Sequence, residues 1–287
     1  MELDIAHLKS WIGRQEIAQD SVTPVPVAAL SATLDRDDPS PRPGDPLPPL
    51  WHWLYFLPLH RQSELGPDGH ARRGGFVPPV PLPRRMWAGG RLRFLAPLRI
   101  GDAISRRSTV VDVTLKHGRS GRMVFVLLRH EISGPHGLAL TEEHDIVYRD
   151  LPGKDEAPPA PRAAPAGGPW RREIMADAVM LFRYSALTFN GHRIHYDRSH
   201  VTEVEAYPGL VVHGPLIATL LLDLLRRHSG GALAAFRFRA IRPIFDNAPF
   251  TTCGAPGTGD SVALWARDEA GALAMEAEAR LETPKSP

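Results

Sequence analysis

The alternation of hydrophobic and polar residues predicts a run of strands in the first half of the chain. Residues 91–98 alternate polar and apolar side chains, as half-buried strands do. Further strands are expected within 108–112, 123–131 and 139–148, with a turn around 116–121. No helical pattern separates these segments, so they predict an antiparallel meander.

The second half of the chain contains a pattern with a different period. Residues 216, 217, 220, 221, 224 and 225 are apolar, which is the spacing of a helix with a broad apolar face. Gly214 and Pro215 suit the first turn of that helix. We expect other elements to cover most of its surface.

The N-terminal part predicts one short helix followed by long loops. Ser21 and Thr23 are candidate N-caps of a helix that has Pro24 in its first turn. Residues 37–49 are rich in proline, and residues 61–85 are irregular and rich in glycine and proline. Loops of this length within a compact domain are often functional.

Residues 151–169 predict an extended linker. They are rich in proline and alanine, and they contain no aromatic or large aliphatic side chain after Leu151. We therefore expect an N-terminal unit over residues 1–150, the linker over 151–169, and a C-terminal unit over 170–287.

The two units look like copies of one ancestral unit. Residues 30–35 are similar to 184–189, and residues 91–98 are similar to 237–244. Residues 86–90 take the place of 211–215 in this comparison. Only the second copy inserts the apolar helix, so a central helix is expected in the C-terminal half and is expected to be reduced in the N-terminal half.

Composition narrows the class of protein. The chain has 287 residues, 43% of them hydrophobic, but no apolar run long enough for a transmembrane helix. The first twenty residues contain four acidic side chains and no apolar signal segment, so we expect a cytoplasmic protein. A net charge of +2 without a basic block argues against nucleic acid. The single cysteine, Cys253, excludes an internal disulfide and a cysteine-based zinc site.

Titratable side chains gather in residues 182–197, shortly before the apolar helix begins. His195 can hold or release a proton near neutral pH. The N–H of Gly214 lies at the positive end of the helix dipole, with no side chain to block its approach. A base and an anion-stabilising donor are the two groups that acyl-thioester chemistry requires.

Residues 189–197 and 208–216 together resemble the hydratase motif of the MaoC-like, type 2 enoyl-CoA hydratases. That motif reads roughly Asp-x-Asn-Pro-x-His-x-Asp/Glu and is followed by His-Gly at the head of the long helix of a hotdog fold. The resemblance covers nearly the whole chain. It implies an α+β protein, a tandem (double) hotdog in which antiparallel sheets wrap a central helix that is kept in the C-terminal half and reduced in the N-terminal half. The chain is most similar to the subgroup of mesaconyl-C4-CoA (3-methylfumaryl-CoA) hydratase, itaconyl-CoA hydratase and 3-hydroxyacyl-thioester dehydratase.

The resemblance places the family's catalytic histidine on His195, its oxyanion glycine on Gly214 and its second acidic residue on Asp197. The family's aspartate falls on Asn190 and its asparagine on His192, and both are departures from the motif. An amide is not a base. We therefore expect His195 to be the principal base and acid, and Asn190 to orient water or substrate. Asp197 either caps a turn or orients His195, and we prefer the second role.

Five further residues are expected to contact the substrate or to support the loop. They are Arg183, Tyr184, His192, Arg193 and His213. The two histidines either touch the substrate or hold the loop, and Tyr184 also suits a packing role. An arginine such as Arg183 is either solvated or supplies a bidentate clamp for a free carboxylate.

Residues outside these motifs are given supporting roles. Residues 51–53 and 84–87, with the aromatic side chains of Trp51, Trp53 and Trp87, are expected to form the wall of the acyl pocket. Arg237, Arg239 and Arg242 either hold CoA phosphates or edge the sheet. No metal and no cofactor is expected beyond the coenzyme A of the substrate.

The expected activity is that of a lyase that adds water to, or removes it from, an enoyl-CoA thioester. The expected substrate is a branched C5 dicarboxylyl-CoA, either mesaconyl-C4-CoA or itaconyl-CoA, giving citramalyl-CoA. The alternatives are a 3-hydroxyacyl-thioester dehydratase of fatty-acid type, a non-catalytic acyl-CoA-binding protein and, more weakly, a thioesterase. No nucleic-acid or membrane partner is expected. A tandem chain can pair its two halves internally, so both a monomer and a homodimer fit.

Overall fold

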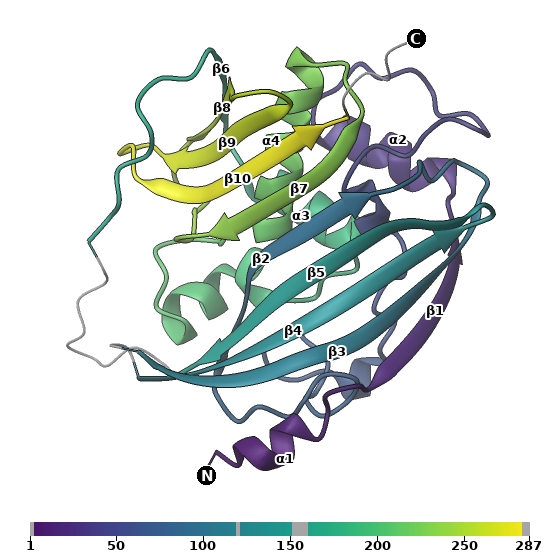
Figure 1. Ribbon diagram of the computed structural model, residues 1–287. Helices are drawn as coiled ribbons and strands as arrows, with labels where there is room; N and C mark the ends of the chain where they lie inside the picture. Colours follow the sequence, from purple (N-terminus) through teal and green to yellow (C-terminus); the bar gives the residue numbers. More distant parts are fainter. Residues whose placement is uncertain (1–2, 119–120, 151–159, 283–287) are drawn as a thin grey trace.

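The strands of the protein form one antiparallel sheet. The computed structural model describes residues 3–118, 121–150 and 160–282 (Figure 1). The strands are β1 (Gln15–Ser21), β2 (Arg84–Phe94), β3 (Ala103–Gly118), β4 (Gly121–Gly134), β5 (Gly137–Arg149), β6 (Trp170–Ile174), β7 (Leu233–Ala240), β8 (Phe250–Pro256), β9 (Ser261–Asp268) and β10 (Leu273–Leu281). Across the sheet they follow the order β1-β3-β4-β5-β2-β7-β10-β9-β8-β6. The expected strands of the first half are confirmed, and each is longer than its hydrophobic pattern indicated.

The two halves of the sheet have the same topology. Read from its outer edge, the N-terminal half runs β1-β3-β4-β5-β2 and the C-terminal half runs β6-β8-β9-β10-β7. The halves join where β2 pairs with β7, so that Arg91 lies opposite Arg237. A left-handed residue also follows the helix after the first strand of each half, Asp35 with φ 55° and Phe189 with φ 50°. These matches support a duplication.

One part of the proposed repeat is wrong. Residues 86–90 were equated with the helix start at 211–215, but they lie inside β2. Gly89 and Gly90 allow the two halves to approach closely, because a Cβ on Gly89 would lie 2.6 Å from the carbonyl oxygen of Phe238. These glycines therefore serve strand pairing and do not mark a helix start.

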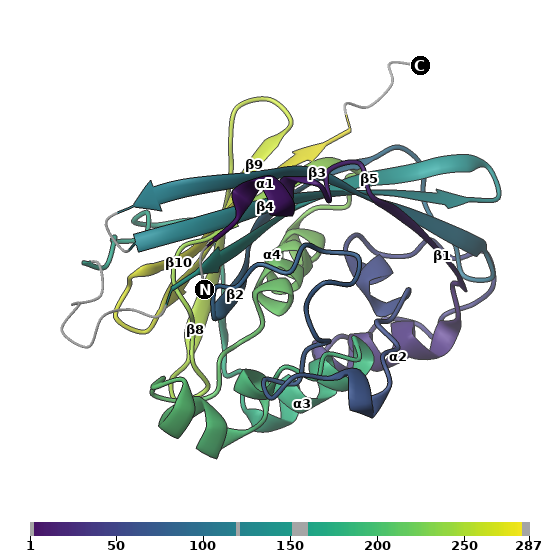
Figure 2. The same cartoon turned by 90° about the horizontal axis from the view of Figure 1, so that it is seen from below.

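Three helices lie on one side of the sheet (Figure 2). They are α2 (Pro24–Thr33), α3 (Ala178–Leu187) and α4 (Gly214–His228). The shorter elements are α1 (Ile5–Lys9), the 3-10 turns η1 (Trp51–Leu54), η2 (Gln62–Glu64) and η3 (Arg193–His195), and the π-helical turn η4 (His200–Val204). α2 and α3 each follow the first strand of their half. α4 has no counterpart among the described residues of the N-terminal half, which confirms the expected asymmetry.

α4 is the centre of the main core. Every residue from 216 to 225 is buried, and the helix packs against β6, β8, β9 and β10. This confirms the broad apolar face that the sequence predicted. A second group of buried side chains lies between β3, β4 and β5 and the loop around Val80 and Leu82.

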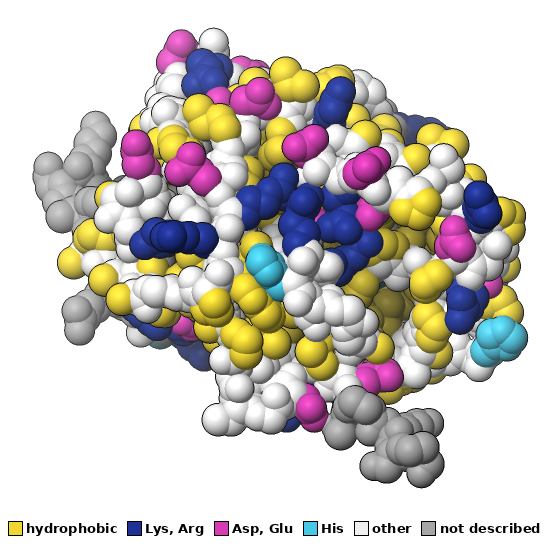
Figure 3. Space-filling model, turned by 90° about the horizontal axis from the view of Figure 1, so that it is seen from above, with side chains coloured by type: hydrophobic (Ala, Val, Ile, Leu, Met, Phe, Trp, Pro, Cys, Tyr) yellow, Lys and Arg dark blue, Asp and Glu magenta, His cyan; other side chains and the backbone are white. Residues whose placement is uncertain are grey.

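A cluster of ion pairs fixes the C-terminal end of α4. Asp223, whose side chain is 1% exposed, pairs with Arg36 at 2.5 Å, with Arg172 at 2.9 Å and with Arg227 at 2.8 Å. Arg36 follows α2, so this carboxylate ties the N-terminal half to α4. In the face seen from above, Lys and Arg side chains gather near the centre with acidic side chains beside them (Figure 3).

Two further expectations concern the linker and the possibility of a membrane-spanning helix. Residues 151–159 of the expected linker lie outside the described residues. Residues 160–169 contain no helix, and Ala163 forms a single antiparallel bridge with Ala272. The helices in the described part of the chain are all too short or too polar to cross a membrane.

Candidate active site

A cavity of about 950 Å³ lies between the two halves. Its N-terminal side is formed by residues after α2 and by inward-facing side chains of β2 to β5. Its C-terminal side is formed by the end of α3, the loop around Asn190, and Pro215 at the start of α4. The cavity therefore reaches the stretch that the sequence singled out.

His195 ends the short turn η3 and is 7% exposed. Its Nδ1 lies 2.7 Å from the carbonyl oxygen of Val211, so Nδ1 carries the hydrogen and Nε2 is left as the basic atom. Nε2 has no hydrogen-bond partner in the described part of the chain. It is not fully buried, so it keeps some access to solvent. Burial lowers the pKa of His195 to about 4, so the ring is neutral at pH 7.

His213 supports His195 from behind. The two rings stack with their centroids 3.6 Å apart. His213 precedes α4, and its Nε2 lies 2.8 Å from the hydroxyl of Ser185 on α3. Burial, with the neighbouring charge of His195, holds the pKa of His213 well below its usual range. His213 is fully enclosed and does not line the cavity, whereas Ser185 and the buried Tyr184 do.

Gly214 is the first residue of α4 and is followed by Pro215, which lines the cavity. A Cβ built on Gly214 would meet no atom within 4 Å, so the space beside this backbone is open. The N–H of Gly214 has no hydrogen-bond acceptor among the described residues. It is thus a free donor at the positive end of a helix of 15 residues.

Asn190 lines the cavity and shapes the loop. Its Oδ1 accepts a hydrogen bond from the N–H of His192 at 3.0 Å, which leaves the Nδ2 hydrogens as donors. His192 is not among the residues that line the cavity. Its ring centroid is 5.4 Å from that of His195 and 4.0 Å from that of His70. Burial, together with the charge of His70, lowers the pKa of His192 to about 2.

Arg193 and Asp197 form a clip beside the site. Arg193 donates to Asp197 at 2.7 Å and to the carbonyl oxygen of Pro67 at 3.0 Å. Asp197 also accepts from the N–H of His200. These bonds lower the pKa of Asp197. Asp197 makes no hydrogen bond to His195, and the carbonyl of Val211 orients that ring instead.

The arginines lie differently from the expectation. Arg183 is exposed on α3 and is not among the residues that line the cavity. Arg85 on β2 does line the cavity. Its guanidinium makes no hydrogen bond or ion pair with any described residue. Its positive charge reaches His192, where it helps to lower the pKa of the imidazole. Arg237, Arg239 and Arg242 pair with Glu278, Glu276 and Asp268 respectively.

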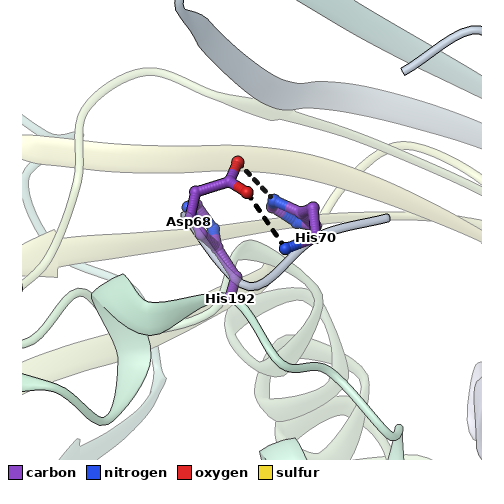
Figure 4. Close-up of side chains that lie close together, drawn as sticks. All are labelled: Asp68, His70 and His192. Atoms are coloured by element: carbon purple, nitrogen blue, oxygen red, sulfur yellow. Dashed lines mark hydrogen bonds and ion pairs between the residues drawn. The ribbon is translucent and has the colours of Figure 1, made fainter. Parts of the chain in front are cut away.

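A loop from the N-terminal half lies against the loop of residues 188–197, called the catalytic loop below because it holds the candidate base His195. Asp68, His70 and His192 each place one potential metal ligand within 4.8 Å of the others (Figure 4). Asp68 Oδ2 lies 3.2 Å from His70 Nδ1, and the rings of His70 and His192 are tilted by 40° with their centroids 4.0 Å apart. The hydrogen bond and the ring contact hold the three side chains together.

A buried polar cluster lies on the N-terminal side of the cavity. Glu142 on β5 is 2% exposed and lies 2.9 Å from His52, 2.9 Å from the indole nitrogen of Trp53 and 2.5 Å from His144. Burial acts to raise the pKa of Glu142, but His144 and His52 outweigh it and hold that pKa well below its usual range. The charge of Glu142 in turn acts on Tyr184. The cluster therefore faces α3.

The expected aromatic wall is divided. Trp53 and Trp87 line the cavity, with their ring centroids 5.0 Å apart. Trp51 is 2% exposed and packs in the core, where Arg226 lies over its ring.

Sequence reasoning did not single out Asp68, His70, Glu142 or His144, and it placed Arg85 only in the wall of the acyl pocket. The loop that holds the first two was noted for its length, but without an alignment nothing distinguished its side chains. Glu142 and His144 had a usable signal, because two polar groups two positions apart on one strand share a face.

The family comparison agrees with this geometry. Residues 50–246 match the family described as hydroxyacyl-thioester dehydratase type 2. Over 272 residues the chain is 46% identical to a mesaconyl-C(4)-CoA hydratase from Chloroflexus aurantiacus, covering 95% of this chain and 97% of that protein.

Solved structures are similar over the whole length. A MaoC-like dehydratase from Phytophthora capsici superposes with a TM-score of 0.67 at 13% identity, covering 99% of this chain and 100% of that one. A Mycobacterium tuberculosis protein described as having a double hotdog fold gives a TM-score of 0.57 at 14% identity, covering 94% of this chain and 96% of that one. These likenesses confirm the tandem hotdog architecture. The chain belongs to the hydroxyacyl-thioester dehydratase type 2 family, within the MaoC-like hotdog proteins.

Proposed function

We propose that the protein hydrates the double bond of an enoyl-CoA thioester whose acyl group is a branched C5 dicarboxylate. Mesaconyl-C4-CoA is the substrate we favour, with citramalyl-CoA as product. The observation that carries the proposal is an unbonded imidazole nitrogen on His195 close to an unbonded N–H on Gly214, since the ring of His195 stacks on that of His213. Tyr196 and Pro215, which directly follow His195 and Gly214, line the cavity. The similarity to a mesaconyl-C(4)-CoA hydratase along nearly the full length of both chains supports the choice of substrate.

In the proposed reaction, Nε2 of His195 takes a proton from water while the water oxygen bonds to the β-carbon. The electrons of the double bond move toward the thioester, whose oxygen becomes enolate-like. The N–H of Gly214 donates to that oxygen, and the start of α4 supports the negative charge. A proton from a second donor then bonds to the α-carbon, and His195 releases its proton to solvent, so one molecule of water is added in all. Loss of one such donor typically costs about 10²–10³ in rate.

The other loop residues have positioning roles in this proposal. Asn190 offers its Nδ2 hydrogens to the attacking water or to the substrate. Ser185 and His213 hold the His195 ring in place, and Tyr184 forms the adjoining wall. The Arg193–Asp197 clip fixes the loop, so we assign it no contact with the reacting atoms.

We assign the free carboxylate of the substrate to Arg85. In mesaconyl-C4-CoA this carboxylate is attached to the carbon that water attacks, so its partner must lie near the catalytic histidine. Arg85 lines the cavity and acts electrostatically on His192, whose ring neighbours that of His195. Of the other lining arginines, Arg193 is already bonded, and Arg106 lies 3.9 Å from Glu16. A guanidinium binds a carboxylate bidentately.

The proposed reaction needs no cofactor beyond the coenzyme A of the substrate, because proton transfer and charge stabilisation complete it. We place the protein in the cytoplasm, where its single buried thiol, Cys253, would stay reduced. The halves already pair with each other through β2 and β7, so either a monomer or a homodimer satisfies the fold.

The test is to follow the enoyl-thioester absorbance with mesaconyl-C4-CoA, itaconyl-CoA and crotonyl-CoA side by side. We expect loss of the double bond, without release of free thiol, and fastest with mesaconyl-C4-CoA. Free thiol would instead indicate a thioesterase, and a preference for crotonyl-CoA would indicate the fatty-acid type of dehydratase. Binding without turnover of any of the three would contradict the proposal.

A further inference from the structure

A carboxylate–imidazole pair from the N-terminal half lies beside the catalytic loop. The loop itself carries the amide of Asn190 where the resembling family has an aspartate. Asp68 and His70 lie across from it, joined by the 3.2 Å hydrogen bond between Oδ2 and Nδ1, and His70 lines the cavity (Figure 4). The two halves therefore bring a carboxylate to a site whose own loop has the amide of Asn190 in place of the family's first aspartate.

The position of this pair is fixed by backbone contacts. The N–H of Arg193 donates to the carbonyl of Asp68 at 2.9 Å. Gly69, which lies between the two side chains, has φ +88°, and a Cβ there would lie 1.8 Å from the carbonyl oxygen of Gly191. Only glycine allows this approach. Asp68 and His70 are thus held against the catalytic loop.

The bond between them sets the state of both groups. Nδ1–H of His70 donates a hydrogen bond to Asp68 Oδ2, so only Nε2 of His70 is left to exchange a proton. Burial acts to raise the pKa of Asp68, but the bond to His70 outweighs it and keeps that pKa well below its usual range. The carboxylate is therefore charged and can balance a positive ring. His70 interacts electrostatically with Asp68, His192 and His195. Arg85 and Arg193 line the same cavity as His70.

We propose that His70 is a second catalytic residue, which exchanges the proton of the α-carbon, and that Asp68 is its positioning residue. This inference rests on the proposed hydratase function and adds a proton donor that His195 alone does not supply. In hydration, His195 Nε2 gains a proton from water as the oxygen bonds to the β-carbon. The Nε2–H bond of protonated His70 breaks, and its proton bonds to the α-carbon. Solvent then returns the proton from His195 to His70, so the sum is the addition of one water.

The test compares His70→Gln and Asp68→Asn with wild type and with His136→Gln, a control in the exposed turn between β4 and β5. We expect His70→Gln to lower kcat about 10²–10³-fold with KM within about threefold, because general acid catalysis contributes about 10²–10⁴-fold. The control should match wild type. Asp68→Asn should lower kcat about tenfold and shift the alkaline limb of the kcat–pH profile to lower pH, since the imidazolium loses its neighbouring negative charge.

A purely structural role would not change the isotope effect. With a hydroxyacyl substrate deuterated at the α-carbon, we expect His70→Gln to show a larger primary isotope effect on dehydration than wild type. An active His70→Gln enzyme with the wild-type pH profile would overturn the inference while leaving the proposed function standing. Absence of turnover by the wild type would overturn both. Loss of activity on chelation, restored by Zn²⁺, would also overturn it, because the three side chains would then be metal ligands.

Discussion

His195 and His213 lie face to face, with ring centroids 3.6 Å apart and an angle of 18° between their planes. Each ring is anchored by its other contact, His195 to the carbonyl of Val211 and His213 to Ser185. Because His213 directly precedes Gly214, the stack fixes the catalytic imidazole relative to the first N–H of α4. The geometry of the proposed base and oxyanion donor is thus set by two buried rings rather than by the loop alone.

Replacing His195 by Gln should remove the base while keeping a side chain of similar size. We expect kcat to fall about 10²–10⁴-fold, with KM within about threefold. In wild type, the pKa of about 4 predicts that kcat/KM falls on the acid side only near pH 4, where the ring becomes protonated. Steady-state rates across pH, together with thermal melting of the variant, check this prediction. An unchanged kcat would remove His195 from the mechanism.

Gly214→Ala should separate catalysis from folding. The added methyl group would meet no protein atom within 4 Å, so we expect a change in the free energy of unfolding below about 1 kcal/mol. The same methyl group would occupy the space beside the oxyanion donor. Hydration should therefore fall about 10²–10³-fold.

Gly69→Ala provides the contrast to that variant. Its Cβ would lie 1.8 Å from the carbonyl of Gly191, so the loop must move and stability should fall together with activity. Urea unfolding and enoyl-CoA turnover, measured for both variants, distinguish a loss of activity alone from a loss of activity together with stability. If Gly214→Ala retained full activity, the assignment of the oxyanion donor would be wrong.

Arg85→Met should change substrate preference rather than activity in general. A hydrogen bond to a charged group is worth about 1.5–3 kcal/mol. We therefore expect kcat/KM for mesaconyl-C4-CoA to fall about 10–100-fold, while crotonyl-CoA, which has no free carboxylate, stays within about threefold. Arg93→Met, on the exposed face of the same strand, is the matched control. Equal losses on both substrates would argue against a carboxylate clamp.

Acid should destabilise the protein through its buried histidines. Burial, with a contribution from His144, lowers the pKa of His130 to about 3 from an ordinary value of 6.5. Below pH 6.5 the unfolded chain therefore binds a proton that the folded chain excludes, and stability falls by about 1.4 kcal/mol per pH unit for this group until about pH 3. His130→Gln should flatten the dependence of the free energy of unfolding on pH. Chemical denaturation between pH 7 and pH 4 measures the slope, and an unchanged slope would contradict the assignment.

The fold was largely predictable because its strongest signals are local. The apolar spacing of residues 216–225 predicted α4, and the alternation along 91–148 predicted the strands of the N-terminal half. The hydratase-like motif and the duplication then indicated the tandem hotdog. The error at residues 86–90 arose because glycines required for close strand approach were equated with Gly214 at the start of a helix.

The site was predictable only where its residues are contiguous. Asn190, His195 and Gly214 lie within a motif, so their proximity could be inferred. Asp68 and His70 lie beside this motif through tertiary packing over more than 100 positions of sequence, and no periodicity records such a contact. Arg183 was the natural candidate for a carboxylate clamp by sequence distance. Its place on the exposed side of α3 became visible only from the structure.

The Asp223 cluster should be the most sensitive electrostatic feature of the fold. Asp223→Asn removes the charge that three arginines share, and it leaves Arg172 partly buried without its ion-pair partner and Arg36 with Asp38 alone. Breaking a buried ion pair by removing one partner costs about 3–5 kcal/mol, so we expect a loss of that order in the free energy of unfolding. Arg36 comes from the N-terminal half, and the loss should therefore loosen the contact between that half and α4. Urea denaturation checks this, with the exposed Glu269→Gln as control. A change below about 1 kcal/mol would mean that the arginines are solvated well enough to need no common carboxylate.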